Sequence, residues 1–96
     1  DIIMVDIVRV GGVSQWMTVA AMAEAANLPI VSHVMPEILG HLVAASSNGL
    51  TVEYMPWMLE LYNETPVVKD GYLHLTDKPG LGLEVNEKAL ERFATH

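Results

Sequence analysis

Three ionisable side chains stand near the ends of three short apolar segments in this sequence. They are Asp6 in IIMVDIV, His33 in IVSH and Glu53 in LTVEYM. An imidazole that is hydrogen-bonded to a carboxylate has a fixed tautomer and is a stronger base, so Asp6 and His33 together could take a proton from a substrate. Glu53, in a poorly solvated site, could stay protonated and donate a hydrogen bond to a developing oxyanion.

These residues also have ordinary structural interpretations. A single histidine after a strand is more often structural than catalytic, and an aspartate at that place can cap backbone N–H groups. His33, Glu37 and His41 are spaced four apart, as in some metal sites. Pro36 interrupts any helix between His33 and the two later residues, which disfavours a zinc site. We expect Glu37 and His41, one helical turn apart, to pair with each other.

Two further residues lie close to this group along the chain. Arg9 follows Asp6 by three residues, where we expect an ordinary ion pair, although Arg9 could also balance carboxylates at the rim of a site. Tyr54 follows Glu53 directly and could line a substrate pocket. If the strand continues, Tyr54 points away from Glu53, because successive side chains of a strand alternate between its faces. The sequence leaves these alternatives open.

An α/β arrangement would bring Asp6, His33 and Glu53 together. The segments 2–8, 30–33 and 50–55 are predicted strands, and the helix-forming segments 15–26 and 37–46 lie between them. Ser14 is predicted to cap the first helix, and Pro36 to open the second. Strands that alternate with helices through short links predict a parallel sheet with right-handed crossovers. Its three carboxyl ends would then share one edge, as they do on the active face of an α/β barrel.

Val19, Met22, Ala23 and Ala26 recur at helical spacing in the segment 15–26 and are predicted to form its buried stripe.

The pattern changes after residue 55. Residues 56–66 are irregular, with a short helical turn expected, and VVKDGYLHL reads as a hairpin that turns at Asp70 and Gly71. A glycine-punctuated loop follows, and Asn86 is predicted to cap a last helix. We therefore expect two parts: residues 1–55, with the strands and helices, and residues 56–96, a carboxyl-terminal extension.

Composition narrows the classes of function. The 96 residues are 51% hydrophobic and 18% charged, which is typical of a globular protein. The five Lys and Arg residues are outnumbered by twelve Asp and Glu residues, which argues against a nucleic-acid-binding surface. The sequence also lacks the run of about 18 apolar residues that would predict a membrane span. The sequence has no cysteine, which fits a cytoplasmic location. Because the chain opens with Asp1 inside an apolar run, we expect it to be a piece of a larger protein.

The quoted segments together resemble a known family. VDIVRVGGVSQW, AEAANLPIVSH, PEILGHLVAA, VEY and DKPGLGLEV are similar to the carboxyl-terminal part of the enolase superfamily, in its mandelate racemase subgroup (the mandelate racemase/muconate lactonizing enzyme family). The resemblance implies a modified TIM barrel, (β/α)7β, with an amino-terminal capping domain. Residues 1–55 would then be barrel strands six to eight with their helices, and residues 56–96 would return towards the capping domain.

The resemblance also implies roles for residues. Asp6 and His33 would form the dyad that acts as general base, and Glu53 would hydrogen-bond the carboxylate of the substrate. Glu37 would support the dyad from below the active face. Arg9 stands where the family usually has a basic residue.

The chemistry implied is removal of the proton alpha to a carboxylate, through an enediolate intermediate, in a Mg²⁺-dependent enzyme. An acid-sugar dehydratase (a lyase) is expected, with a racemase or epimerase (an isomerase) or a non-catalytic barrel fragment as the alternatives. The metal ligands of the family lie on strands three to five, and a second, lysine base lies on strand two. All of these strands are missing here, so we expect no metal site and no activity in this piece alone. The remainder of the enzyme, a small carboxylate substrate and further copies in a dimer or octamer are the expected partners.

Overall fold

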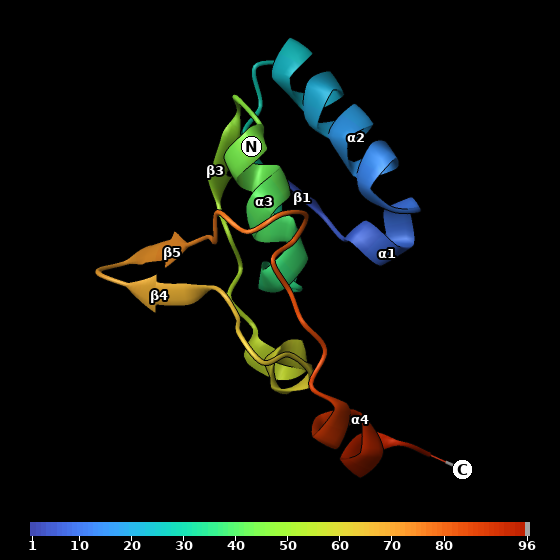
Figure 1. Cartoon of the computed structure of the whole chain (residues 1–96). Coiled ribbons are helices and arrows are strands. Elements are labelled where there is room, and N and C mark those ends of the chain that lie inside the picture. Colours follow the sequence, from blue (N-terminus) through green and yellow to red (C-terminus); the bar gives the residue numbers. More distant parts are fainter. Residues whose placement is uncertain (96) are drawn as a thin grey trace.

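The computed structural model describes residues 1–95 of the chain. Strands β1 (Ile3–Val5), β2 (Ile30–Ser32) and β3 (Gly49–Thr51) form a parallel sheet in the order β1-β2-β3. Helices α2 (Val13–Ala25) and α3 (Pro36–Ala45) connect them (Figure 1). The predicted alternation of strand and helix and the parallel sheet are confirmed, although the strands at 2–8 and 50–55 are shorter than predicted.

Strand β1 ends early because a short helix begins directly after it. Helix α1 (Ile7–Val10) has Asp6 at its N-cap and ends at Gly11, whose φ of 99° is in the left-handed region that glycine adopts without strain. Helix α2 begins at Val13 with Gly12 as its N-cap and no side-chain cap. The prediction that Ser14 caps this helix is therefore wrong, because the preceding glycine turn places Ser14 inside the first turn.

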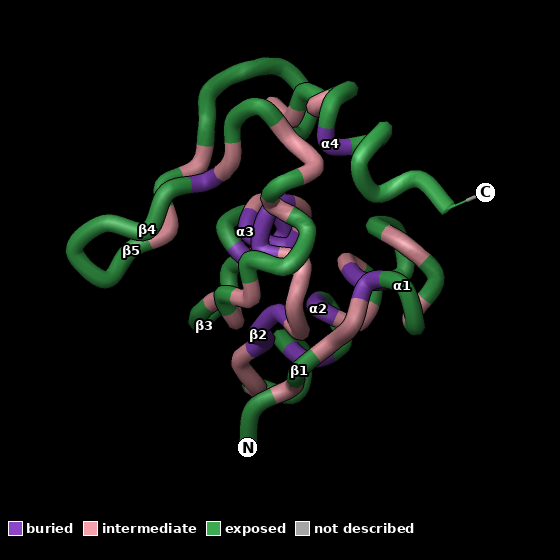
Figure 2. Tube along the Cα trace, turned by 90° about the horizontal axis from the view of Figure 1, so that it is seen from below, coloured by how far each residue is buried: buried purple, intermediate pink, exposed green. Residues whose placement is uncertain are grey.

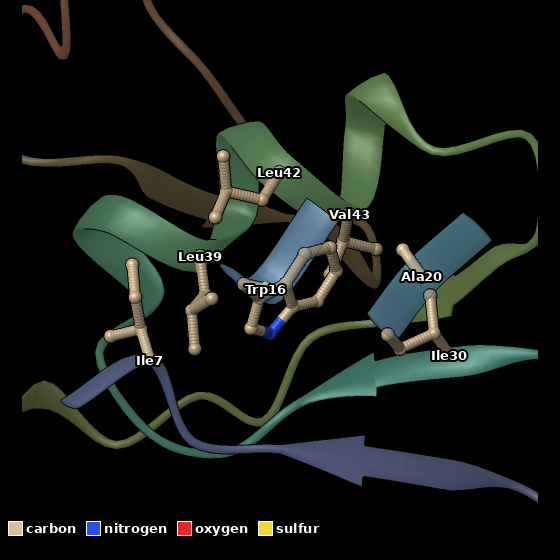
Figure 3. Close-up of a cluster of buried hydrophobic side chains, with 7 residues drawn as sticks. All are labelled: Ile7, Trp16, Ala20, Ile30, Leu39, Leu42 and Val43. Atoms are coloured by element: carbon tan, nitrogen blue, oxygen red, sulfur yellow. The ribbon is translucent and has the colours of Figure 1, made fainter. Parts of the chain in front are cut away.

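The hydrophobic core lies between the sheet and the two long helices, which cover the same face (Figure 3). Trp16 is fully buried there, and its Nε1–H donates to the carbonyl oxygen of Val5 at 3.2 Å. The predicted stripe of α2 is right for two of its four residues: Ala23 is buried and Val19 packs against the core, whereas Met22, which is 67% exposed, and Ala26 face solvent. The helix buries three residues one turn apart, Trp16, Ala20 and Ala23. The complete core cluster comprises Ile7, Trp16, Ala20, Ile30, Leu39, Leu42 and Val43.

Residues 56–95 form a thinner extension. It contains a 3-10 helix, η1 (Pro56–Leu61), an antiparallel hairpin of β4 (Val67–Lys69) and β5 (Tyr72–His74), and helix α4 (Glu87–Phe93). The hairpin turns at Asp70 and Gly71, both at positive φ, as predicted. Asn86 caps α4, also as predicted, and its side chain accepts from the backbone N–H of Ala89. Most of this extension is exposed (Figure 2).

The extension crosses α3 at close range (Figure 1). A Cβ atom at Gly40 would come within 2.9 Å of Leu73 Cδ2, so a larger residue there would require the side chain of Leu73 to shift. Nε2 of His41 contacts the carbonyl oxygen of Leu81 at 3.2 Å. Among the helices of residues 1–95, none combines the length and the apolar character that crossing a bilayer requires.

Candidate active site

Asp6 and His33 meet at the carboxyl ends of β1 and β2. Val5 pairs with Ser32 in the parallel register, so the next residue of each strand emerges at the same edge of the sheet. Nδ1 of His33 lies 2.9 Å from Oδ2 of Asp6, and the backbone N–H of His33 donates to Val5 at 3.2 Å. The hydrogen bond that the sequence predicted between these side chains is present.

The two oxygens of Asp6 have separate partners. Oδ1 accepts from the backbone N–H groups of Val8 and Arg9 at 2.8 and 2.9 Å, while Oδ2 faces His33. The N–H group of Arg9 is the main cause of a lowered pKa of Asp6, and the bonds from His33 and Val8 lower this pKa further, whereas partial burial opposes them. Asp6 is therefore ionised at neutral pH, and both interpretations of it, cap and dyad partner, hold at once.

The charge of Asp6 decides the tautomer of His33. An ionised carboxylate can only accept, so Nδ1 of His33 carries the proton of their hydrogen bond. In the neutral ring Nε2 is then an acceptor, and it has no hydrogen bond within residues 1–95. The ring is 37% exposed, so a substrate has access to this nitrogen. This is the arrangement that a general base requires.

A shallow pocket of about 440 Å³ opens beside the dyad. Arg9 stands at its rim with a side chain that is 84% exposed, and its Nε is 4.0 Å from Oδ2 of Asp6. An exposed pair at this distance contributes little to stability. The pocket is lined by Met4, Val5, Asp6, Arg9, Val10 and His33.

Glu53 joins the same edge from beyond the end of β3. Its backbone N–H donates to Oγ of Ser32 at 2.8 Å, and its Oε2 accepts from the backbone N–H of Val34 at 2.7 Å. Glu53 is thus hydrogen-bonded to the residue that follows His33 in the chain. Within the described residues it makes no direct hydrogen bond to Asp6 or His33. Oε2 is thus an acceptor for the protein, and the donor role that the sequence indicated for Glu53 stays a prediction for Oε1.

Sequence reasoning missed Ser32 and Val34. Ser32 is fully buried, and its hydroxyl supplies an acceptor where the ladder between β2 and β3 has ended. Val34 and Met35 both have positive φ, at 48° and 46°. The only local signal is Pro36, which disfavours the right-handed helical conformation at the residue before it.

Glu37 and His41 do not pair. Glu37 is 1% exposed, and neither carboxylate oxygen has a hydrogen-bond partner within residues 1–95, so it makes no such contact with the dyad either. His41 is turned to the extension and contacts Leu81. The predicted pair is wrong because one side chain enters the interior and the other faces outwards.

Tyr54 lies away from the dyad. It lines a groove of about 510 Å³ between α3, β3 and the β4–β5 hairpin, together with residues such as Gly40, Thr51 and Tyr72. This is the outcome expected from the alternation of side chains along an extended segment, with Glu53 on one side and Tyr54 on the other.

The described residues do not fit a metal ion. Residues 1–95 contain no group of three or more His, Cys, Asp or Glu side chains that could hold one. Mg²⁺ binds through oxygen ligands in octahedral geometry. Both oxygens of Asp6 and one of Glu53 already accept hydrogen bonds from the protein. A metal at this edge of the sheet would need ligands from elsewhere.

Comparison with known proteins adds to this geometry. The family model described as enolase C-terminal domain-like matches residues 1–89. D-xylonate dehydratase of Haloferax volcanii is 31% identical over 95% of the chain and 24% of its own length. Muconate cycloisomerase 1 of Pseudomonas putida is 32% identical over 98% of the chain and 28% of its own length.

The fold is also similar to that of a solved structure from the same group of enzymes. L-talarate dehydratase from Polaromonas sp. JS666, complexed with Mg and L-glucarate, superposes with a TM-score of 0.89 at 34% identity. The match covers 95% of this chain and 25% of that protein. The chain therefore spans about a quarter of the length of the proteins that it matches.

Proposed function

The chain belongs to the enolase C-terminal domain-like family, and from this premise we propose that it carries the general base of a magnesium-dependent acid-sugar dehydratase. The observation that carries the proposal is the 2.9 Å contact between His33 and Asp6, which leaves Nε2 of His33 at the edge of a pocket without a hydrogen bond to any of residues 1–95. Similarity to D-xylonate dehydratase and L-talarate dehydratase supports the choice of dehydration.

His33 would act twice in this reaction. Nε2 first takes the proton alpha to the carboxylate of the substrate, and the C–H electron pair passes into an enediolate. The imidazolium, stabilised by Asp6, then returns the proton to the departing beta-hydroxyl, which leaves as water. The enol that remains tautomerises to the 2-keto acid. Asp6 takes no part in proton transfer beyond fixing the ring and its charge.

Glu53 would face the carboxylate of the substrate with its second oxygen. Oε2 is occupied by the N–H of Val34, whereas Oε1 has no hydrogen bond within the described residues. To bind another carboxylate, Oε1 must carry a proton and donate it in a hydrogen bond. Arg9, at the rim of the pocket, supplies positive charge near an incoming anion.

The rest of the enzyme would come from polypeptide beyond these 96 residues. We assign β1, β2 and β3 to barrel strands six, seven and eight, and residues 56–96 to the segment that returns to a capping domain. We assign the Mg²⁺ ligands and a second base to other strands of that barrel. The 96 residues alone are expected to be inactive.

A panel of acid sugars tests the proposal with the intact protein and Mg²⁺. D-xylonate and L-glucarate are suitable first members, since relatives are named for or crystallised with them. We expect a 2-keto acid to form from at least one acid of the panel. A panel that yields neither a keto product nor exchange of the alpha proton with D₂O would contradict the proposal and favour a non-catalytic barrel fragment.

An isomerase is the second candidate, supported by the similarity to muconate cycloisomerase 1. The same dyad can remove an alpha proton for racemisation or epimerisation, with a second base on the opposite face of the substrate. The panel separates the two reactions. Alpha-deuterium incorporation without keto product would indicate the isomerase, because the beta-hydroxyl then stays in place.

A further inference from the structure

The segment that follows His33 has a strained backbone. Val34 and Met35 have φ of 48° and 46°, so two successive residues other than glycine occupy the left-handed region. A β-branched residue such as Val34 rarely adopts this conformation, because its side chain crowds the backbone. Such strain persists only where the surrounding structure holds it, and it occurs most often at functional sites.

Glu53 is hydrogen-bonded to this turn. The N–H of Val34 donates to Oε2 of Glu53 at 2.7 Å, and the N–H of Glu53 donates to the buried hydroxyl of Ser32 at 2.8 Å. Together these two bonds connect the residue before His33 and the residue after it to the same glutamate. On the other side, the N–H of His33 is bonded to Val5.

We propose that Glu53 is a positioning residue for His33: through Oε2 it holds the strained turn at Val34 and so fixes the imidazole ring against Asp6. At 2.7 Å the bond is at the short end of the range for N–H···O hydrogen bonds. Glu53 therefore has two roles, with Oε2 turned to the protein and Oε1 left for a ligand. That the ring so placed removes a proton rests on the proposed function, whereas the hold on the turn does not.

Amide hydrogen exchange of Val34 in the intact protein tests the hold directly. Glu53→Gln keeps a carbonyl oxygen that can accept from Val34, so we expect protection within about threefold of the parent. Glu53→Ala removes the acceptor, and the Val34 amide should exchange at least about tenfold faster. Equal protection of Val34 in the parent and in Glu53→Ala would overturn the proposal.

The Nδ1 proton of His33 tests the positioning. In the parent this proton lies in the bond to Asp6, and NMR measures its exchange with water. We expect exchange about tenfold faster in Glu53→Ala and close to the parent in Glu53→Gln. Adding Val34→Gly to Glu53→Ala should restore slow exchange, because glycine adopts positive φ without a clamp. The double variant also serves if Glu53→Ala alone fails to fold.

A role of Glu53 towards the substrate alone predicts a different result. The His33 proton would then exchange equally slowly in all four proteins, which would overturn the positioning role. Neither measurement uses a substrate. An inactive panel of acid sugars would therefore count against the proposed function and leave the result on Glu53 intact.

Discussion

At the scale of single residues, the site depends on two carboxylates that are held by backbone N–H groups. Asp6 caps α1 with Oδ1 and orients His33 with Oδ2, and Glu53 holds the turn at Val34 with only one of its oxygens. A capping aspartate is rigid, because its oxygen is tied to two backbone N–H groups. Through its hydrogen bond to Asp6, the imidazole of His33 is therefore fixed in tautomer and orientation before a substrate binds.

The lowered pKa of Asp6 predicts a pH dependence of stability. Its folded pKa lies below the ordinary value of 3.8, so the ionised form stabilises the native state. This contribution is fully present above about pH 4 and is lost as the pH falls through the folded pKa. Asp6→Asn keeps an oxygen for the cap but cannot ionise. We expect urea midpoints of the parent to fall more between pH 5 and pH 2.5 than those of Asp6→Asn.

The exposed residue Asp77 gives a matched control for that comparison. Asp77→Asn removes one carboxylate without touching the site, and its midpoints should follow those of the parent. Equal acid sensitivity in the parent and in Asp6→Asn would show that the native state does not depend on the charge of Asp6.

Some contacts of the site residues could be predicted from the sequence and others could not. The contact of Asp6 with His33 could be predicted because both residues follow neighbouring parallel strands. The conformation of Val34 could not, because it depends on the carboxylate of Glu53, which is 19 residues away in the chain. Glu53 itself was found as an ionisable strand-end residue, but its partner was a backbone N–H that no residue pattern reveals.

At the scale of elements, the order of strands and helices follows from apolar periodicity and from glycine and proline signals. Pro36 and Asn86 mark helix starts that the structure shows. The buried face of α2 was mispredicted in part, at Met22 and Ala26, because periodicity weighs every apolar residue alike. The indole of Trp16 decides this face, since it is the largest side chain that fits under the sheet and it bonds Val5.

The buried carboxylate of Glu37 on helix α3 has no hydrogen-bond partner within residues 1–95. Glu37 is 1% exposed with both oxygens unsatisfied within residues 1–95. Buried carboxylates in native proteins are paired or hydrogen-bonded, so we infer that donors outside the described residues satisfy Glu37 in the intact protein. Its removal would leave those donors unpaired.

The effect of a Glu37 substitution on the free energy of unfolding tests this inference. In the intact protein Glu37→Met should lower the free energy of unfolding by about 3 kcal/mol, as expected when one member of a buried polar pair is lost. Leu39→Met, on the same helix and equally buried, conserves volume and should cost less than about 1.5 kcal/mol. Denaturant unfolding gives both values. A Glu37→Met protein as stable as the parent, or more so, would mean that the carboxylate has no partner.

At the scale of the whole molecule, the chain is more extended than an independent domain of its length. Its radius of gyration is 14.3 Å, whereas a compact domain of this size has roughly 12.5 Å. In the three-stranded sheet, β1 and β3 each have β2 as their only neighbouring strand within the described part of the chain. The hairpin and α4 project from the main body (Figure 1). These features suit a part that packs against further polypeptide, as the proposed barrel requires.

The open edges predict how the isolated chain behaves. Expressed alone, residues 1–96 should self-associate, because the unpaired edges of β1 and β3 and exposed apolar side chains such as Met4 and Leu50 favour contact between copies. Light scattering after gel filtration would measure the mass. Met4→Lys or Leu50→Lys should reduce the association, and a single monomeric species from the unmodified chain would contradict this view.

The dyad provides the most direct test of the account. The measurement is exchange of the alpha proton of an acid sugar with D₂O, catalysed by the intact protein and followed by NMR. His33→Asn should lower the rate at least about 100-fold, because it removes the proton acceptor. His41→Asn, a control on the neighbouring helix, should stay within about threefold of the parent. An alpha-proton exchange rate in His33→Asn equal to that of the parent would contradict the assignment of His33 as the base.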